Sequence, residues 1–123
     1  MSLKMVRLEL ARDPEYPTGS RERGYEFVAP LDPDGTLNVE EWRANRDRCR
    51  VKRFWPDQNW PIGRLVYTPD GSWIFDFDPN RSDDDVPGFK LDKRKIVPGE
   101  YISFRENDGE LRAYFVVTVE ELD

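Results

Sequence analysis

The sequence contains no histidine, and Cys49 is its only cysteine. Without histidine, the chain lacks the commonest general base and the commonest transition-metal ligand. A single cysteine excludes an internal disulfide, so the fold depends on packing alone. We therefore favour a non-enzymatic protein with no catalytic residues, no metal and no cofactor. Cys49 has a functional interpretation, a stabilised thiolate, and a structural one, a small buried hydrophobe. We favour the structural interpretation.

Long apolar runs are also missing. No stretch approaches the 18 or more apolar residues of a membrane span, and the first residues show no apolar run of signal-peptide length. We expect a cytoplasmic protein that does not enter a membrane. From its length of 123 residues we expect a single domain, residues 1–123. The net charge of −6 disfavours wrapping by nucleic acid but does not exclude a local basic patch.

Alternation of apolar and polar residues dominates the chain. Such a period of two is typical of half-buried strands, and turn residues separate the runs. Asp32-Pro33-Asp34-Gly35 predicts a turn, and Asn38 predicts the N-cap of a helix from Val39 to Arg46. The remaining pattern predicts a mainly β fold, an antiparallel barrel or sandwich of about eight short strands with one short helix. The expected strands are 4–11, 24–29, 49–55, 63–68, 72–77, 89–91, 100–105 and 111–119.

The last of these runs has the longest alternation in the chain. Its odd-numbered residues are apolar, which favours placing them on the buried face of the strand. The sequence therefore predicts that Leu111, Phe115 and Val117 are buried together with Phe104.

Three runs of the sequence resemble a small family of uncharacterised bacterial proteins. They are Gly24 to Leu31, Glu41 to Val51, and Val97 to Tyr101. The resemblance covers most of the chain. It implies a bacterial, cytoplasmic origin and no particular activity.

A basic, aromatic segment extends from Trp42 to Trp55. It holds six cations and one acid, Asp47, so its local net charge is +5. Arginines that bind phosphate beside aromatic rings that stack on bases are typical of single-strand recognition. An ordinary solvated strand face explains the same pattern. The anion-binding candidates are Arg48, Arg50, Lys52 and Phe54.

An acidic segment from Asp76 to Asp85 has the alternating oxygen ligands that calcium prefers. Arg81 stands where an EF-hand has glycine, and Pro87 stands where it has the bidentate glutamate. We predict a solvated loop with no specific calcium site, and whether it binds any cation is left open.

Two tryptophans lie in a proline-bounded loop that begins at Trp55. Tryptophan is frequent at the centres of protein interfaces and also seals the ends of barrels. The ligand-binding candidates are Trp55, Trp60 and Tyr67.

These signals leave the function unknown and the alternatives open. We favour a binding or interaction module that recognises a protein or peptide through the aromatic loop. Anion or single-stranded nucleic-acid binding through the basic strand is the alternative, and an enzyme of unknown type is third. Homo-oligomerisation is left open. Peptide binding should survive high salt, whereas phosphate binding should fall steeply with salt.

Overall fold

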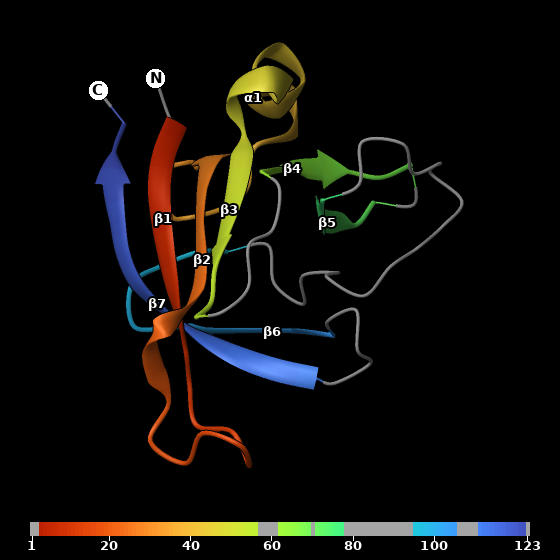
Figure 1. Cartoon of the computed structure of the whole chain (residues 1–123). Coiled ribbons are helices and arrows are strands. Elements are labelled where there is room, and N and C mark those ends of the chain that lie inside the picture. The colour runs from red at the N-terminus through yellow and green to blue at the C-terminus, as the bar shows by residue number, and fades with distance from the viewer. Residues whose placement is uncertain (1–2, 57–61, 70, 78–94, 106–110, 123) are drawn as a thin grey trace.

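The computed structural model describes residues 3–56, 62–69, 71–77, 95–105 and 111–122. Their seven strands form one antiparallel sheet, in the order β5-β4-β3-β2-β1-β7-β6. The strands are β1 (Leu3–Leu10), β2 (Ser20–Pro30), β3 (Arg50–Phe54), β4 (Gly63–Tyr67), β5 (Trp73–Asp76), β6 (Tyr101–Arg105) and β7 (Leu111–Glu121). The sheet curls into a half-barrel, with helix α1 (Val39–Ala44) at its upper end and the β1–β2 loop at its lower end (Figure 1).

The expected fold class is therefore confirmed: the protein is mainly β and antiparallel, with one short helix in the described residues. Seven of the expected strands are present with small shifts of their ends. The eighth, at residues 89–91, lies outside the described part of the chain. The helix ends at Ala44 rather than Arg46, and a turn of 3-10 helix, η1 (Arg46–Arg48), follows it.

Local chemistry sets the start of α1 and the turn before it. The Asn38 side chain accepts a hydrogen bond from the Glu41 backbone N–H at 2.9 Å, as an N-cap does. The Gly35 N–H donates to the Asp32 carbonyl at 2.8 Å, and the φ of Gly35 is 88°, a value that glycine adopts without strain. Trp42 lies in the core and donates its indole N–H to the Leu65 carbonyl at 2.8 Å. This bond fastens the helix to β4.

The core lies on the concave face of the sheet. Alternate residues of β1, which are Val6, Leu8 and Leu10, are buried as their period predicts. They meet fully buried aromatic rings from four other strands. These rings are Tyr25, Phe27, Phe75, Phe104 and Tyr114.

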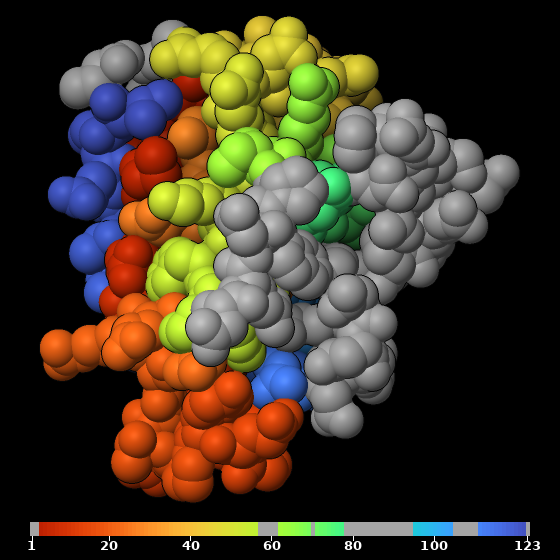
Figure 2. All heavy atoms as spheres, in the orientation of Figure 1, coloured from red at the N-terminus to blue at the C-terminus, as the bar shows by residue number. Residues whose placement is uncertain are grey.

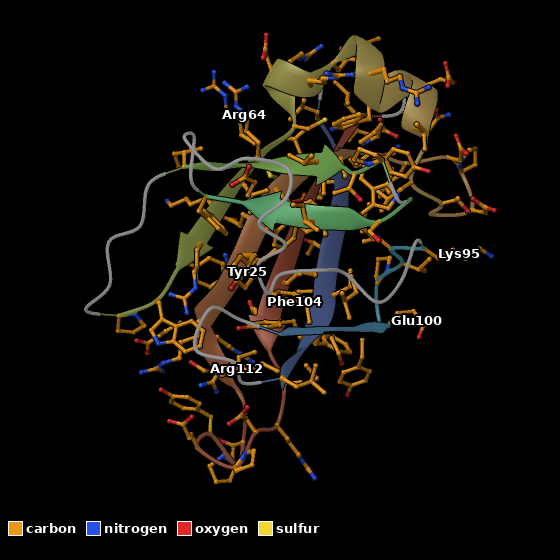
Figure 3. All side chains as sticks on the ribbon, turned by 90° about the vertical axis from the view of Figure 1, so that its right-hand side faces the viewer. Tyr25, Arg64, Lys95, Glu100, Phe104 and Arg112 are labelled. Carbon is orange, nitrogen blue, oxygen red and sulfur yellow. The ribbon has the colours of Figure 1, made fainter. Side chains whose placement is uncertain are left out.

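Ring contacts join these strands across the curled sheet. Tyr25 lies 5.2 Å from both Phe104 and Tyr114, and 5.3 Å from Phe75, between ring centroids. Figure 3 shows Tyr25 and Phe104 side by side in the middle of the half-barrel. Because Phe75 and Phe104 also lie 5.5 Å apart, strands β5 and β6 at the two edges of the sheet meet through one aromatic cluster.

The predicted burial of the β7 residues is wrong. Leu111 is 59% exposed, and Phe115 and Val117 are only partly buried, whereas Arg112, Tyr114 and Val116 are buried. Phe104, on β6, is buried as predicted. The core side of β7 is therefore formed by the even-numbered residues in its first half.

A β-bulge explains part of this result. Arg7 pairs with Thr118 whereas Leu8 pairs with Val116, so Val117 is an extra residue in β7. Such a residue moves the alternation of the strand by one position. Val119, beyond the bulge, then packs against the core, as the even-numbered residues do before it. An unbroken alternation in the sequence does not reveal this shift.

Candidate functional site

Trp55 follows β3 at the lower end of the half-barrel, where three arginines surround its half-buried ring. The Arg53 guanidinium carbon lies 4.2 Å from the ring centroid, and those of Arg23 and Arg112 each lie 5.7 Å from it. Significant cation–π contacts occur about once per 70–80 residues. Three guanidiniums at one indole are therefore an unusual concentration of positive charge on an aromatic ring.

The β1–β2 loop supplies a second ring. Tyr16 meets Trp55 edge-on, with the centroids 6.2 Å apart, and the Arg23 guanidinium lies 4.4 Å from the Tyr16 centroid. We call Tyr16, Arg23, Arg53, Trp55 and Arg112 the Trp55 cluster. Its members come from β2, β3, β7 and the β1–β2 loop, so antiparallel pairing of these strands brings the cluster together.

Arg112 ties the loop to the sheet. It donates to Asp13 at 3.1 Å and to Glu15 at 2.9 Å. The side chains of Arg112 and Asp13 are only 6% and 8% exposed, so their ion pair is buried, whereas Glu15 is at the rim. Figure 3 shows Arg112 at the lower end of the half-barrel, at the opposite end from Arg64. The ion pair fixes the position of Tyr16 against Trp55.

Arg23 differs from Arg112 in its partners. Its guanidinium donates to the Ser20 hydroxyl at 3.0 Å, and no carboxylate of the described residues pairs with it. Its Nε is buried and has no hydrogen-bond partner among the described atoms. The Nε of Arg112 is buried in the same way. Because Arg23 as a whole is only half-buried and has no carboxylate partner among the described residues, an anion could gain a charge-assisted hydrogen bond at the accessible part of its guanidinium.

The structure separates the three predicted aromatic residues. Tyr67 packs on Trp73 at 4.8 Å and on Trp42 at 6.2 Å between centroids. The described ring contact of Trp55 is with Tyr16 instead. Trp60 lies outside the described residues. Trp55 and Tyr67 therefore belong to two separate clusters. The cluster of Tyr67 packs on the buried rings of the core.

The basic strand has the exposed side chains that its pattern indicates. Arg48, Arg50 and Lys52 are exposed. Phe54 is half-buried, and the Arg7 guanidinium lies 4.3 Å from its ring centroid, so one face of this ring is covered. The structure adds Arg64, which stands directly opposite Arg50 on β4.

Sequence reasoning did not identify Tyr16, Arg23 and Arg112 as candidate residues. Residues 16 and 112 are almost the length of the chain apart, and each lies in a segment with an ordinary pattern. Arg112 occupies an inward position of a strand. Such a position indicates a buried ion pair, because arginine is seldom fully buried unless it is paired. That signal was hidden because the sequence placed the opposite face of β7 in the core.

Cys49 is fully buried, and burial raises the pKa of its thiol from 9.0 to about 11. A pKa that is two units higher lowers the fraction of thiolate about a hundredfold at neutral pH, and the thiolate is the reactive form. We expect an aromatic disulfide reagent at pH 8 to modify the native protein far more slowly than the protein unfolded in guanidinium. Equal rates in the two states would contradict the burial of Cys49.

Within the described ranges, no group of three or more histidine, cysteine, aspartate or glutamate side chains is placed to hold a metal ion. Most of the acidic segment from Asp76 to Asp85 lies outside these ranges, so its solvation and cation binding stay predictions. None of the described helices is long and apolar enough to cross a bilayer.

In comparisons with known proteins, no family model, no curated protein and no solved structure matches the chain. The resemblance to a small bacterial family thus stays a prediction.

Proposed function

We propose that this protein is a non-enzymatic binding module, and that the Trp55 cluster recognises an acidic segment of a partner protein. The observation that carries the proposal is Arg23, a half-buried arginine beside Trp55 whose guanidinium has no carboxylate partner among the described residues. A carboxylate of a partner, bound at the solvent-accessible part of this half-buried side chain, would balance its charge. Tryptophan, tyrosine and arginine are also the residues that dominate binding energy at protein interfaces.

The cluster is preorganised for such binding. Arg53 stacks on Trp55 and donates its Nε–H to the Tyr25 hydroxyl at 3.2 Å, so its position is fixed from the core side. The buried pair of Arg112 and Asp13 holds the β1–β2 loop in place. A site that is already ordered loses less conformational entropy when the ligand binds. This fixed arrangement supports recognition of a short extended segment.

The acidic character of the ligand follows from the balance of charge. Among the described residues, Asp13 and Glu15 pair with Arg112, and no carboxylate pairs with Arg23. The partner segment therefore supplies the carboxylate that Arg23 lacks. Because part of the binding comes from contact with the rings of Trp55 and Tyr16, we expect binding to survive at high salt.

Peptide display on the intact chain tests this proposal. We expect peptides selected from a random library to be enriched in aspartate and glutamate. In fluorescence anisotropy, Arg23→Gln should weaken their binding about ten- to hundredfold, since one charge-assisted hydrogen bond is lost. Arg21→Gln is the matched control, because Arg21 is exposed two residues away on the same strand and, among the described residues, forms no side-chain hydrogen bond or ion pair with the cluster.

Two results would overturn the proposal. One is a selected set without acidic enrichment. The other is equal binding to wild type and Arg23→Gln. The variant is expected to keep the wild-type unfolding midpoint to within a small shift, which circular dichroism can verify before the binding experiment.

A further inference from the structure

A second group of cations lies on the outer face of the sheet. Arg50 and Lys52 stand at alternate positions of β3, so their side chains share its outward face, and the exposed Arg48 precedes them at the end of η1. We call these three residues the cationic strip. Alternate residues of a strand are about 6.8 Å apart. In Figure 2 the yellow spheres of η1 and the yellow-green and green spheres of β3 and β4 adjoin one another on the face shown.

Several other cations of the described residues have ion pairs, whereas the strip has none among them. Lys4 pairs with Glu121, Arg7 with Glu9 and Glu26, and Arg43 with Glu40. Among the described residues, no carboxylate lies within 4.0 Å of a cationic group of the strip. Within the described part of the chain, these three exposed cations therefore have no carboxylate partner of their own.

Cross-strand pairing strengthens this charge. Arg50 stands directly opposite Arg64, and like charges at such positions destabilise a sheet. Asp47 reduces the repulsion only in part: its carboxylate lies 3.5 Å from the Arg64 guanidinium, and its carbonyl accepts from the Arg50 Nε at 3.2 Å. The latter bond orients the Arg50 guanidinium. An anion bound between the two arginines would relieve the repulsion.

Two acids limit the extent of the site. Glu26 stands opposite Lys52, and Asp76 stands opposite Arg64. Glu26 borders the strip on β2, and Asp76, on β5, lies beyond Arg64 of β4, so the positive charge follows β3 and its edge with β4 rather than spreading across the sheet. A narrow line of regularly spaced cations is complementary to a linear chain of phosphates. Phe54, the ring that continues the line, has the Arg7 guanidinium on one face, which removes that face from stacking on a base.

We propose that the cationic strip binds linear chains of phosphates, either the backbone of a single-stranded nucleic acid or inorganic polyphosphate, without selecting bases. The ligand and the surface both differ from those of the Trp55 cluster, so the proposal does not depend on peptide recognition. Contact with three phosphates predicts a slope of about −2 in a plot of log affinity against log salt.

Labelled oligo(dT) and oligo(dA) of equal length, titrated with the intact protein at low salt, test this inference. We expect both to bind with similar affinity, and inorganic polyphosphate of the same length to displace them. Alanine at all three strip positions should weaken binding at least tenfold and bring the salt slope toward zero. The control removes the same charge at three exposed cations outside the strip, Arg12, Arg21 and Lys95, and should change binding less than twofold.

Absence of binding by every probe below about 100 µM at low salt would overturn the inference, because non-specific phosphate binding reaches this range even at physiological salt. Equal loss of affinity in the strip and control variants would overturn it too, since net charge alone would then explain binding. Strong preference for one base would show that a ring, and not the phosphate chain, is recognised. Polyphosphate that binds while the oligonucleotides do not would identify the source of the phosphates and uphold the site.

Discussion

Replacing Tyr114 with alanine is expected to lower the free energy of unfolding by about 3–5 kcal/mol, as removal of a large buried ring does. The ring is fully buried, stacks on Phe104 with the centroids 5.0 Å apart, and meets Tyr25 edge-on. Its loss would leave a cavity where strands β2, β6 and β7 join. Aromatic pairs add stabilisation beyond the area that they bury, so the neighbouring rings lose contacts as well.

The adjacent residue provides the control. Phe115 faces the outer side of β7, where it is partly buried and meets the 52% exposed Tyr101 at 5.3 Å. We expect Phe115→Ala to cost about 1 kcal/mol, because its side chain leaves little cavity in the core.

Urea unfolding of both variants, extrapolated linearly to water, measures the difference. The alternation of the sequence alone predicts the opposite order, with Phe115 in the core. If Phe115→Ala cost as much as Tyr114→Ala, or more, the face assigned to β7 would be wrong.

Replacing Arg112 with leucine is expected to cost about 3–5 kcal/mol, because it leaves the Asp13 carboxylate buried without its charged partner. Both side chains are at most 8% exposed, and Asp13 lies in the loop that carries Tyr16. The variant also removes one of the guanidiniums around Trp55. We therefore expect a less stable protein in which the β1–β2 loop is no longer held against the sheet.

A double-mutant cycle with Asp13→Asn isolates the ion pair. We expect Arg112→Leu to cost about 1–3 kcal/mol less in the Asp13→Asn background than in wild type, the usual coupling between residues in contact. Glu15→Gln serves as the comparison. Glu15 is 62% exposed, and breaking an exposed pair costs at most about 1 kcal/mol. Additive effects of Arg112→Leu and Asp13→Asn would show that the pair does not stabilise the fold.

Several features of the fold follow from short stretches of sequence. The alternation of Val6, Leu8 and Leu10 marks a strand and its buried face, because a period of two leaves one face apolar. The Asp32 to Gly35 turn and the Asn38 cap depend on side chains that bond their own backbone, which is a local property. These signals were enough to predict a mainly β antiparallel fold with one short helix.

The inward face of β7 is a different case. Leu111, Ala113, Phe115 and Val117 alternate as cleanly as any run in the chain, yet Tyr114 and Val116 are the buried residues. Both sets contain large apolar residues, so composition does not separate the faces. The register of β7 against β1 and the bulge at Val117 decide the matter, and both arise only when the strands pair.

The sequence by itself determined which stretches become strands, where the chain turns, that Cys49 has no disulfide partner, and that cations alternate along β3. Each of these depends on neighbours within a few positions. Only the tertiary structure decided that Arg23, Arg53 and Arg112 meet around Trp55, and that Tyr67 packs on the tryptophans of the core instead. The reason is that a sheet sets its neighbours by strand order and register, which bring distant residues together and which no local pattern encodes.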